Sequence, residues 1–229
     1  MKTISIAALG DSLLKGVVLT DRNRYSVLDD SFINIVSREL DFRVDNFAKF
    51  GCTVNFGHNV IDRHSDELSG YDYTFLEYGG NDCDFDWMKI ADDPHSEHHP
   101  KTLLQNFKEQ FLGLVRRIVE LGSKPIIISL PPIDSEIYFN FISRAMNQQQ
   151  KDNVMKWLGG DVNIIERWHE SYNQALFEIS EKTGTPIIDI TTPFRRDGSS
   201  IKELVCSDGI HPNQAGHKLI ANSISNMYF

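Results

Sequence analysis

The stretch at 125–130, Pro-Ile-Ile-Ile-Ser-Leu, is a short and almost continuous apolar run. Such a run is typical of a strand that is buried on both faces of a parallel sheet. The segment at 186–190 has the same character, and three further apolar segments, at 3–9, 42–47 and 73–78, are also predicted as strands. Because segments of helical period separate most of these strands, the sequence predicts an α/β fold with a five-stranded parallel sheet covered on both faces.

Helices are predicted where apolar residues recur at helical spacing, over 28–40, 103–121, 161–183 and 212–227. Pro212 is predicted to begin the last of them, since proline is well tolerated in the first turn of a helix. The apolar stripes of these helices are predicted to face the sheet.

The composition is that of an ordinary globular chain. Its 229 residues favour one large domain over 1–229, and 41% hydrophobic with 24% charged residues excludes collagen-like, disordered and disulfide-scaffold classes. The formal charge of -9 argues against a nucleic-acid partner. No apolar run approaches the roughly 20 residues of a membrane span, so no membrane insertion is predicted.

The cysteines and the N-terminal segment bear on the compartment. Cys52, Cys83 and Cys206 are far apart in sequence and form no C-x-x-C pair. The first ten residues carry one lysine and only a weak apolar run, which is not a convincing signal peptide. Together these features favour a reducing, cytoplasmic location.

Two connections are longer than is usual in a compact domain, at 79–101 and 131–160. Each follows the carboxyl end of a predicted strand, where open α/β sheets bind their ligands. The second is predicted as an insertion that covers the site, and its candidate apolar residues are Ile133, Ile137, Tyr138, Phe139 and Phe141.

A serine and a histidine lie in turns at opposite ends of the chain. The first strand leads into Gly10-Asp11-Ser12-Leu13, where a glycine before the serine allows a sharp turn. Near the other end, Asp208 and His211 are three residues apart across a turn, so the carboxylate can hold one imidazole nitrogen while the other acts as a base. Taken singly, each piece is also explained as an ordinary turn or helix start.

Two further turns offer hydrogen-bond donors. Asn81 follows the third strand in Gly79-Gly80-Asn81-Asp82, and its amide can face a developing oxyanion. Gly51 follows the second strand and can expose its backbone N–H to the same cleft. All four pieces are therefore predicted at one edge of the sheet.

The combination resembles the SGNH-hydrolase, or GDSL lipase/esterase, family over the whole length of the chain. The matching blocks are Gly10-Asp11-Ser12-Leu13 with Gly16, 46–51 with Thr53, Gly79-x-Asn81-Asp82, and Asp208-x-x-His211-Pro212 with Gly216. Leu14 stands where a threonine is common, and Ala48-Lys49 where a glycine is frequent. The resemblance implies a flavodoxin-like three-layer α/β/α sandwich and hydrolysis of a small-molecule carboxylic ester, without metal or organic cofactor.

The resemblance also implies the roles of the site residues. Ser12 is the expected nucleophile, His211 the general base and Asp208 the residue that orients it. The expected oxyanion hole consists of the Ser12 and Gly51 backbone N–H groups and the Asn81 amide. Asp11 and Asp82 are predicted to stabilise turns rather than to react.

Two other classes of function stay open at this point. Acidic and histidine residues between 82 and 99 could hold a metal in a metal-dependent hydrolase, but no known ligand spacing is present and a solvated polar loop is favoured. The chain could also be a non-catalytic carbohydrate-binding module that uses the sheet-edge cleft, since a fold alone does not ensure chemistry.

The substrate is the least determined feature. Leu13, Phe50, Phe85 and Trp87 are candidate binding residues. We expect short acyl esters, with acetyl groups on carbohydrates as the leading candidate and a lysophospholipase or thioesterase acting on longer acyl chains as the alternative. The sequence makes no prediction of the oligomeric state.

Overall fold

The computed structural model describes residues 3–196 and 200–227. Within these residues, five parallel strands form one sheet in the order β4-β1-β5-β6-β7. They are β1 (Ser5–Gly10), β4 (Arg43–Asn46), β5 (Tyr73–Glu77), β6 (Lys124–Ile128) and β7 (Ile187–Ile188). The predicted five-stranded parallel sheet is confirmed, and its strand order is that of flavodoxin-like folds.

The central strands β1, β5 and β6 are buried on both faces, as their apolar sequences predict, whereas the edge strand β4 is partly exposed. In β1, Ile6 and Ala8 belong to the core on one face of the sheet, whereas Ala7 and Leu9 belong to the core on the other. This alternation follows from the two-residue period of a strand. Removing such side chains from water stabilises the fold by roughly 1.5 to 3 kcal/mol for each large aliphatic residue.

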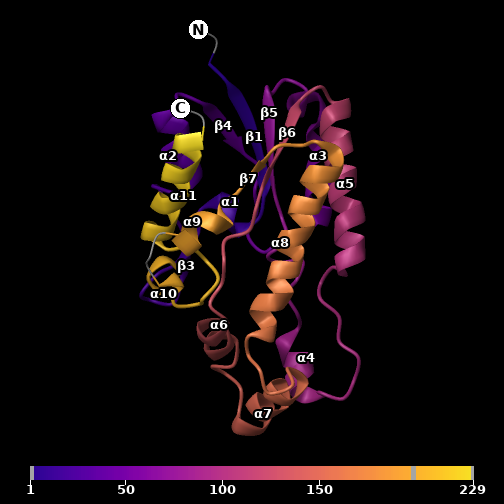
Figure 1. Cartoon of the computed structure of the whole chain (residues 1–229), viewed down its shortest axis with the longest axis vertical. Helices are drawn as coiled ribbons and strands as arrows, with labels where there is room; N and C mark the ends of the chain where they lie inside the picture. Colours follow the sequence, from indigo (N-terminus) through magenta and orange to yellow (C-terminus); the bar gives the residue numbers. More distant parts are fainter. Residues whose placement is uncertain (1–2, 197–199, 228–229) are drawn as a thin grey trace.

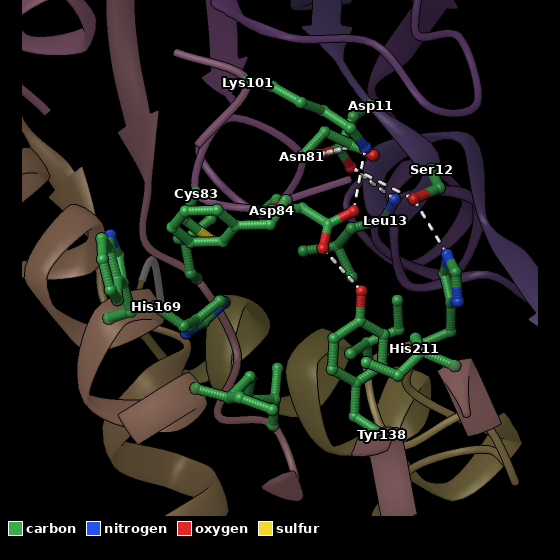
Figure 2. Close-up of a pocket in the computed structure, with 18 of the residues that line it drawn as sticks. Asp11, Ser12, Leu13, Asn81, Cys83, Asp84, Lys101, Tyr138, His169 and His211 are labelled. Atoms are coloured by element: carbon green, nitrogen blue, oxygen red, sulfur yellow. Dashed lines mark hydrogen bonds and ion pairs between the residues drawn. The ribbon is translucent and has the colours of Figure 1, made fainter. Parts of the chain in front are cut away.

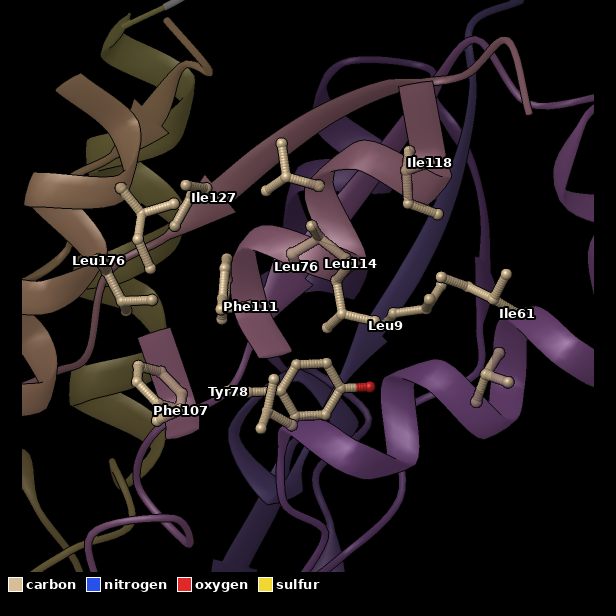
Figure 3. Packing of buried hydrophobic residues seen from close by; sticks show 14 of the residues in the cluster. Leu9, Ile61, Leu76, Tyr78, Phe107, Phe111, Leu114, Ile118, Ile127 and Leu176 are labelled. Atoms are coloured by element: carbon tan, nitrogen blue, oxygen red, sulfur yellow. The ribbon is translucent and has the colours of Figure 1, made fainter. Parts of the chain in front are cut away.

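One helical layer consists of α3 (Val54–Leu68), α5 (Leu104–Glu120) and α8 (Ile164–Thr183), which lie together on one side of the sheet (Figure 1). Figure 3 shows their apolar side chains, such as Leu114 and Leu176, packed against Leu76 and Ile127 of the strands. Helices α5 and α8 were predicted. No prediction covered α3, whose few apolar positions are interrupted by asparagine, histidine and glycine.

The opposite layer is formed by α2 (Phe32–Glu39) and α11 (Gln214–Met227), with α9 (Thr191–Arg196) and α10 (Ile201–Leu204) beside them (Figure 1). The predicted start of the last helix at Pro212 is wrong by two residues. Pro212 instead pairs with Val205 in a β-bridge, and the Asn213 side chain accepts the N–H groups of Ala215 and Gly216. An asparagine side chain can satisfy the free amide groups at a helix start, which proline cannot do.

A third apolar cluster lies beyond the carboxyl ends of the strands. It contains α4 (Trp87–Asp92), α6 (Ser135–Ile142) and α7 (Gln148–Trp157), at the lower end of Figure 1, together with the start of α8. The helix α1 (Ser12–Lys15) and the antiparallel pair β2 (Val17–Leu19) and β3 (Tyr25–Val27) follow β1. In the described part of the chain, every helix is too short or too polar to cross a bilayer.

Candidate active site

Ser12 occupies the turn between β1 and α1. Asp11 caps the helix, because its Oδ1 accepts the Leu13 N–H at 2.9 Å. As the first residue of α1, Ser12 has a backbone N–H without an acceptor inside the helix. Ser12 is buried and lines a cavity at the carboxyl edge of the sheet.

Ser12, His211 and Asp208 form a continuous chain of hydrogen bonds, although Ser12 and His211 are 199 residues apart. Nε2 of His211 lies 2.9 Å from Ser12 Oγ (Figure 2), and Nδ1 of His211 lies 2.7 Å from Asp208 Oδ2. All three side chains are buried. The imidazole is therefore placed to remove the hydroxyl proton.

Asp208 is held in its ionised form. Burial by itself raises the pKa of this carboxyl, but hydrogen bonds and charge from His211 outweigh burial and lower it below the ordinary value. Its Oδ1 also accepts the backbone N–H groups of Ile210 and His211, both at 3.1 Å. An ionised acceptor at Nδ1 selects the tautomer in which Nε2 is free to accept the Ser12 proton.

Helix α6 rests on the turn that carries Asp208 and His211. The Gly209 carbonyl accepts the Asp134 N–H at 2.8 Å. Gly209 has φ 78, and a Cβ there would lie 2.6 Å from the backbone nitrogen of Tyr138. Only glycine allows this approach, so the position of the turn depends on α6.

The three residues expected to supply the oxyanion hole, Ser12, Gly51 and Asn81, all line the same cavity. Gly51 follows β4 with φ 74, a conformation that suits glycine. The Asn81 Nδ2 donates to Asp11 Oδ2 at 2.8 Å, which engages one of its two hydrogens. The second hydrogen is left for another acceptor.

The cavity that begins at Ser12 has a volume of about 320 Å³ and a mainly apolar wall. The four residues predicted to bind substrate, Leu13, Phe50, Phe85 and Trp87, all line it. Phe50 is the exposed member, with 46% of its surface accessible, and marks the mouth. The other three are buried deeper.

The family model of the GDSL-like lipase/acylhydrolases matches residues 8–219. The chain belongs to this family. It is therefore a carboxylic ester hydrolase by class, and the predicted resemblance to SGNH hydrolases is confirmed. No curated protein matches the sequence.

Solved structures of the same fold resemble the chain along nearly its full length. A lipase/acylhydrolase from Enterococcus faecalis is 17% identical with a TM-score of 0.68, covering 98% of this chain and 95% of that one. A catalytic mutant of an acetylxylan esterase from Geobacillus stearothermophilus is 17% identical with a TM-score of 0.65, covering 99% and 94%. A lipolytic G-D-S-L family protein from Veillonella parvula is 15% identical with a TM-score of 0.64, covering 99% and 98%.

This family member carries a buried carboxyl pair beneath Ser12 that the sequence analysis missed. Glu77, the last residue of β5, lies beside Asp11, whose N–H donates to Glu77 Oε2 at 3.3 Å. Burial raises the pKa of both carboxyls, most of all that of Glu77, where the neighbouring Asp11 charge adds to it. The pKa of Glu77 is raised the more strongly, so Glu77 is the member of the pair that we expect to hold the proton, while Asp11 accepts hydrogen bonds from the Leu13 N–H, the Asn81 amide and the Ser12 hydroxyl. The sequence feature that could have indicated this pair is a glutamate, Glu77, at the end of an otherwise apolar strand.

Tyr25 was also missed, and it covers the imidazole at the mouth. The Tyr25 and Phe50 rings lie 5.3 and 5.9 Å from the His211 ring, and 4.9 Å from each other. Burial and the Asp208 charge raise the pKa of Tyr25 to about 12, so its phenol is neutral. Tyr25 lies in the short strand β3, which has no apolar alternation strong enough to predict it.

The segment at 131–160 forms α6 and α7 and supplies part of the cavity wall. Of the residues predicted as its apolar cover, Ile133, Tyr138 and Phe141 line the cavity, whereas Ile137 and Phe139 do not. Ile137 instead lies against Gly209, and Phe139 packs into the third apolar cluster. On a helix, neighbouring residues point in different directions, so one face alone can reach the cavity.

The acidic side chains between 82 and 99 are engaged in hydrogen bonds or ion pairs. Asp84 accepts from Trp87, Lys101 and Tyr138 at 2.7 to 2.9 Å, which joins this loop to α6. Asp82 accepts the Val54 N–H at 3.1 Å, which joins the loop after β5 to the start of α3. Among the described residues, no three His, Cys, Asp or Glu side chains are grouped to hold a metal ion.

Proposed function

We propose that the chain hydrolyses esters through a covalent acyl-enzyme on Ser12. The observation that carries this proposal is the pair of contacts at 2.9 and 2.7 Å that links Ser12 through His211 to Asp208. A serine hydroxyl is a weak nucleophile unless a base removes its proton, and His211 is the base within reach.

In the first half-reaction, His211 Nε2 takes the Ser12 proton while Oγ attacks the ester carbonyl carbon. The tetrahedral intermediate collapses, its bond to the leaving oxygen breaks, and His211 returns the proton to the departing alcohol. In the second half, water attacks the acyl-enzyme with His211 again as base. The products are the carboxylic acid and free Ser12.

Negative charge on the former carbonyl oxygen is stabilised by the Ser12 and Gly51 N–H groups and by the Asn81 amide. All three belong to the wall of one cavity. Asp11 receives one hydrogen of the Asn81 amide and so orients the other. Donors held in place before reaction need no reorganisation as the charge develops.

For the substrate we favour short acyl esters, with acetyl groups on carbohydrates as the leading candidate. One similar structure is described as an acetylxylan esterase. The cavity wall of this chain combines aromatic faces, at Phe50 and Trp87, with the polar groups of Asp84 and Lys101. Aromatic faces with hydrogen-bonding groups suit a sugar ring. The segment at 131–160 would act as the cover over the bound ester.

Longer acyl chains are the second candidate, as in a lysophospholipase or thioesterase. The mainly apolar wall of the cavity, including Leu158, Ile164 and Ile165, favours this alternative. A comparison of kcat/KM for p-nitrophenyl acetate, butyrate and palmitate separates the two. We expect the acetate or butyrate ester to be preferred, and a clear palmitate preference would reverse the assignment.

The acyl-enzyme itself is tested with a fluorophosphonate probe. We expect covalent labelling of Ser12, located by mass spectrometry of the labelled peptide, and no labelling of Ser12→Ala. Folded protein that resists the probe and hydrolyses none of the three esters would instead support a non-catalytic carbohydrate-binding module.

A further inference from the structure

His169 of α8 is a buried imidazole in the cavity wall that the proposed reaction does not use. Its side chain is 6% exposed, and it belongs to the lining of the cavity. Figure 2 shows it on the side opposite Ser12 and His211, with Asp84 and Tyr138 in the space between. It therefore lies at the end of the cavity away from the nucleophile.

The His169 ring has no hydrogen-bond or ion-pair partner within residues 3–196 and 200–227. Other histidines with restricted exposure have one. His58 Nε2 bonds the Gln110 carbonyl at 3.0 Å, and His217 Nδ1 accepts the Phe32 N–H at 3.2 Å. A buried polar group without a partner is costly, and such groups are usually satisfied by protein, water or ligand. The open side of the His169 ring is the cavity.

The ring is uncharged at neutral pH. Burial lowers the pKa of His169 to about 4, and no carboxylate opposes this effect. A neutral imidazole offers one N–H donor and one acceptor nitrogen. Asp84 and Lys101, charged members of the same wall, are paired with each other at 2.9 Å.

The neighbouring wall is aromatic. The Phe85 ring lies 4.6 Å from the Trp168 ring in an edge-to-face arrangement, and Trp157 stacks on Trp168 at 6.0 Å. Ile165 is one helical turn before His169, and both line the cavity. A charged group would lose its hydration in this setting, whereas a hydroxyl can both donate to and accept from a neutral imidazole.

We propose that His169 is a specificity-determining residue, and that this end of the cavity binds an uncharged hydroxyl group carried by the ester substrate. The inference rests on the proposed function and narrows its substrate class to hydroxylated esters. The Phe85 and Trp168 rings would lie against the carbon frame that carries the hydroxyl. The hydroxyl can belong to the acyl part or to the alcohol part, and the test separates these sources.

Two matched pairs of esters test the proposal. The acyl arm compares p-nitrophenyl 6-hydroxyhexanoate with p-nitrophenyl hexanoate, and the alcohol arm compares 4-hydroxycyclohexyl acetate with cyclohexyl acetate. In one arm we expect the wild-type chain to favour the hydroxylated ester in kcat/KM by about fivefold or more, since one hydrogen bond is typically worth such a factor. The arm that shows the preference identifies the part of the ester that reaches His169.

The same ratio is then measured in His169→Phe and His169→Gln. A ratio cancels any general loss of activity within a variant. We expect a ratio near one in H169F and a partly restored ratio in H169Q, which keeps a donor and an acceptor. His64→Gln is the control, because His64 is an exposed histidine of α3 outside the cavity, and it should keep the wild-type ratio. A wild-type ratio near one in both arms, or an unchanged ratio in H169F, would overturn the proposal.

A binding measurement keeps this test separate from catalysis. In Ser12→Ala, the ring nitrogen resonances of His169 are followed by NMR while 1,4-cyclohexanediol or cyclohexanol is added. We expect the diol to shift them and the deoxygenated alcohol to shift them less. Equal shifts would contradict the hydroxyl site, whereas a selective shift in a chain that hydrolyses no ester would contradict the proposed function alone.

Discussion

The side-chain amide of Asn81 donates a hydrogen bond to the carboxylate of Asp11, with Nδ2 2.8 Å from Oδ2. The same carboxylate caps the helix that begins at Ser12. One buried acidic group thus fixes both the nucleophile turn and the amide that faces the cavity. Ser12 follows β1 and Asn81 follows β5, so the hydrogen bond between Asn81 and Asp11 holds the two loops together.

Replacing Asn81 with alanine removes one of the three proposed oxyanion donors. We expect Asn81→Ala to fold but to lose about 100-fold or more in kcat, because a single such donor typically contributes roughly 2.7 to 4 kcal/mol. The measurement is steady-state hydrolysis of p-nitrophenyl acetate together with a thermal melt. Near wild-type kcat in a folded variant would remove Asn81 from the proposed site.

Asp208→Asn tests the orientation of the imidazole. An amide at this position can present an N–H to His211 Nδ1, which favours the wrong tautomer and leaves Nε2 unable to accept the Ser12 proton. We expect kcat to fall by about 10³- to 10⁴-fold. The rate of fluorophosphonate labelling should fall in parallel, and unchanged labelling would show that His211 does not depend on Asp208.

Glu77→Gln tests the inferred protonation of the buried pair. Burial and the Asp11 charge raise the pKa of Glu77 well above its ordinary value in the folded chain. The stability that the protonated form contributes is complete below the ordinary Glu pKa of 4.5 and is lost as the pH rises through the higher pKa of the folded chain. Glutamine stays neutral, so E77Q should be the more stable protein at pH 8, on the order of 1 kcal/mol, with the difference shrinking toward pH 4.5.

Urea unfolding of both proteins between pH 4.5 and 8 measures this difference. Since Gln retains an acceptor for the Asp11 N–H, we expect kcat at pH 7 to stay within about threefold of the wild type. Parallel stability profiles for the two proteins would contradict a protonated Glu77.

Gly209→Ala tests the dependence of the catalytic turn on α6. Its Cβ would lie 2.6 and 2.8 Å from backbone atoms of Tyr138 and Asp134, so the turn or the helix must shift. We expect a loss of stability of roughly 1 to 3 kcal/mol and a fall in kcat of at least about tenfold. Gly160→Ala is the matched control: Gly160 has φ 81, but a Cβ there meets nothing within 4 Å.

We expect Gly160→Ala to lose stability through backbone strain but to keep the wild-type kcat. Equal effects on kcat in the two variants would mean that backbone strain alone, and not the contact with α6, accounts for the loss at Gly209.

Dialysis against EDTA tests the metal-dependent alternative. The acidic side chains after β5 are engaged with protein donors, including Asp84 with Lys101 and Asp93 with Ser96. We therefore expect kcat/KM for p-nitrophenyl acetate to be unchanged after dialysis. Loss of activity that added zinc restores would favour the metal-dependent reading.

The strands and most of the long helices could be predicted from local pattern, because a buried strand or a helix facing a sheet must repeat apolar residues at its own period. Helix α3 was not predicted because Asn55, His58 and Asn59 interrupt the helical repeat of its apolar residues. Its packing against α5 and the sheet stabilises what the local sequence does not indicate.

The sequence by itself determined the fold class. It also predicted the proposed reacting groups, since Ser12, Asn81 and the turn from Asp208 to His211 lie where parallel strands or the last helix place them at one edge. Only the tertiary structure decided how Glu77 meets Asp11, how Tyr25 covers His211, and which side of α8 turns His169 toward the cavity. These are contacts between residues far apart along the chain, and their geometry depends on how whole layers pack. The spacing of apolar residues within one segment does not predict such packing.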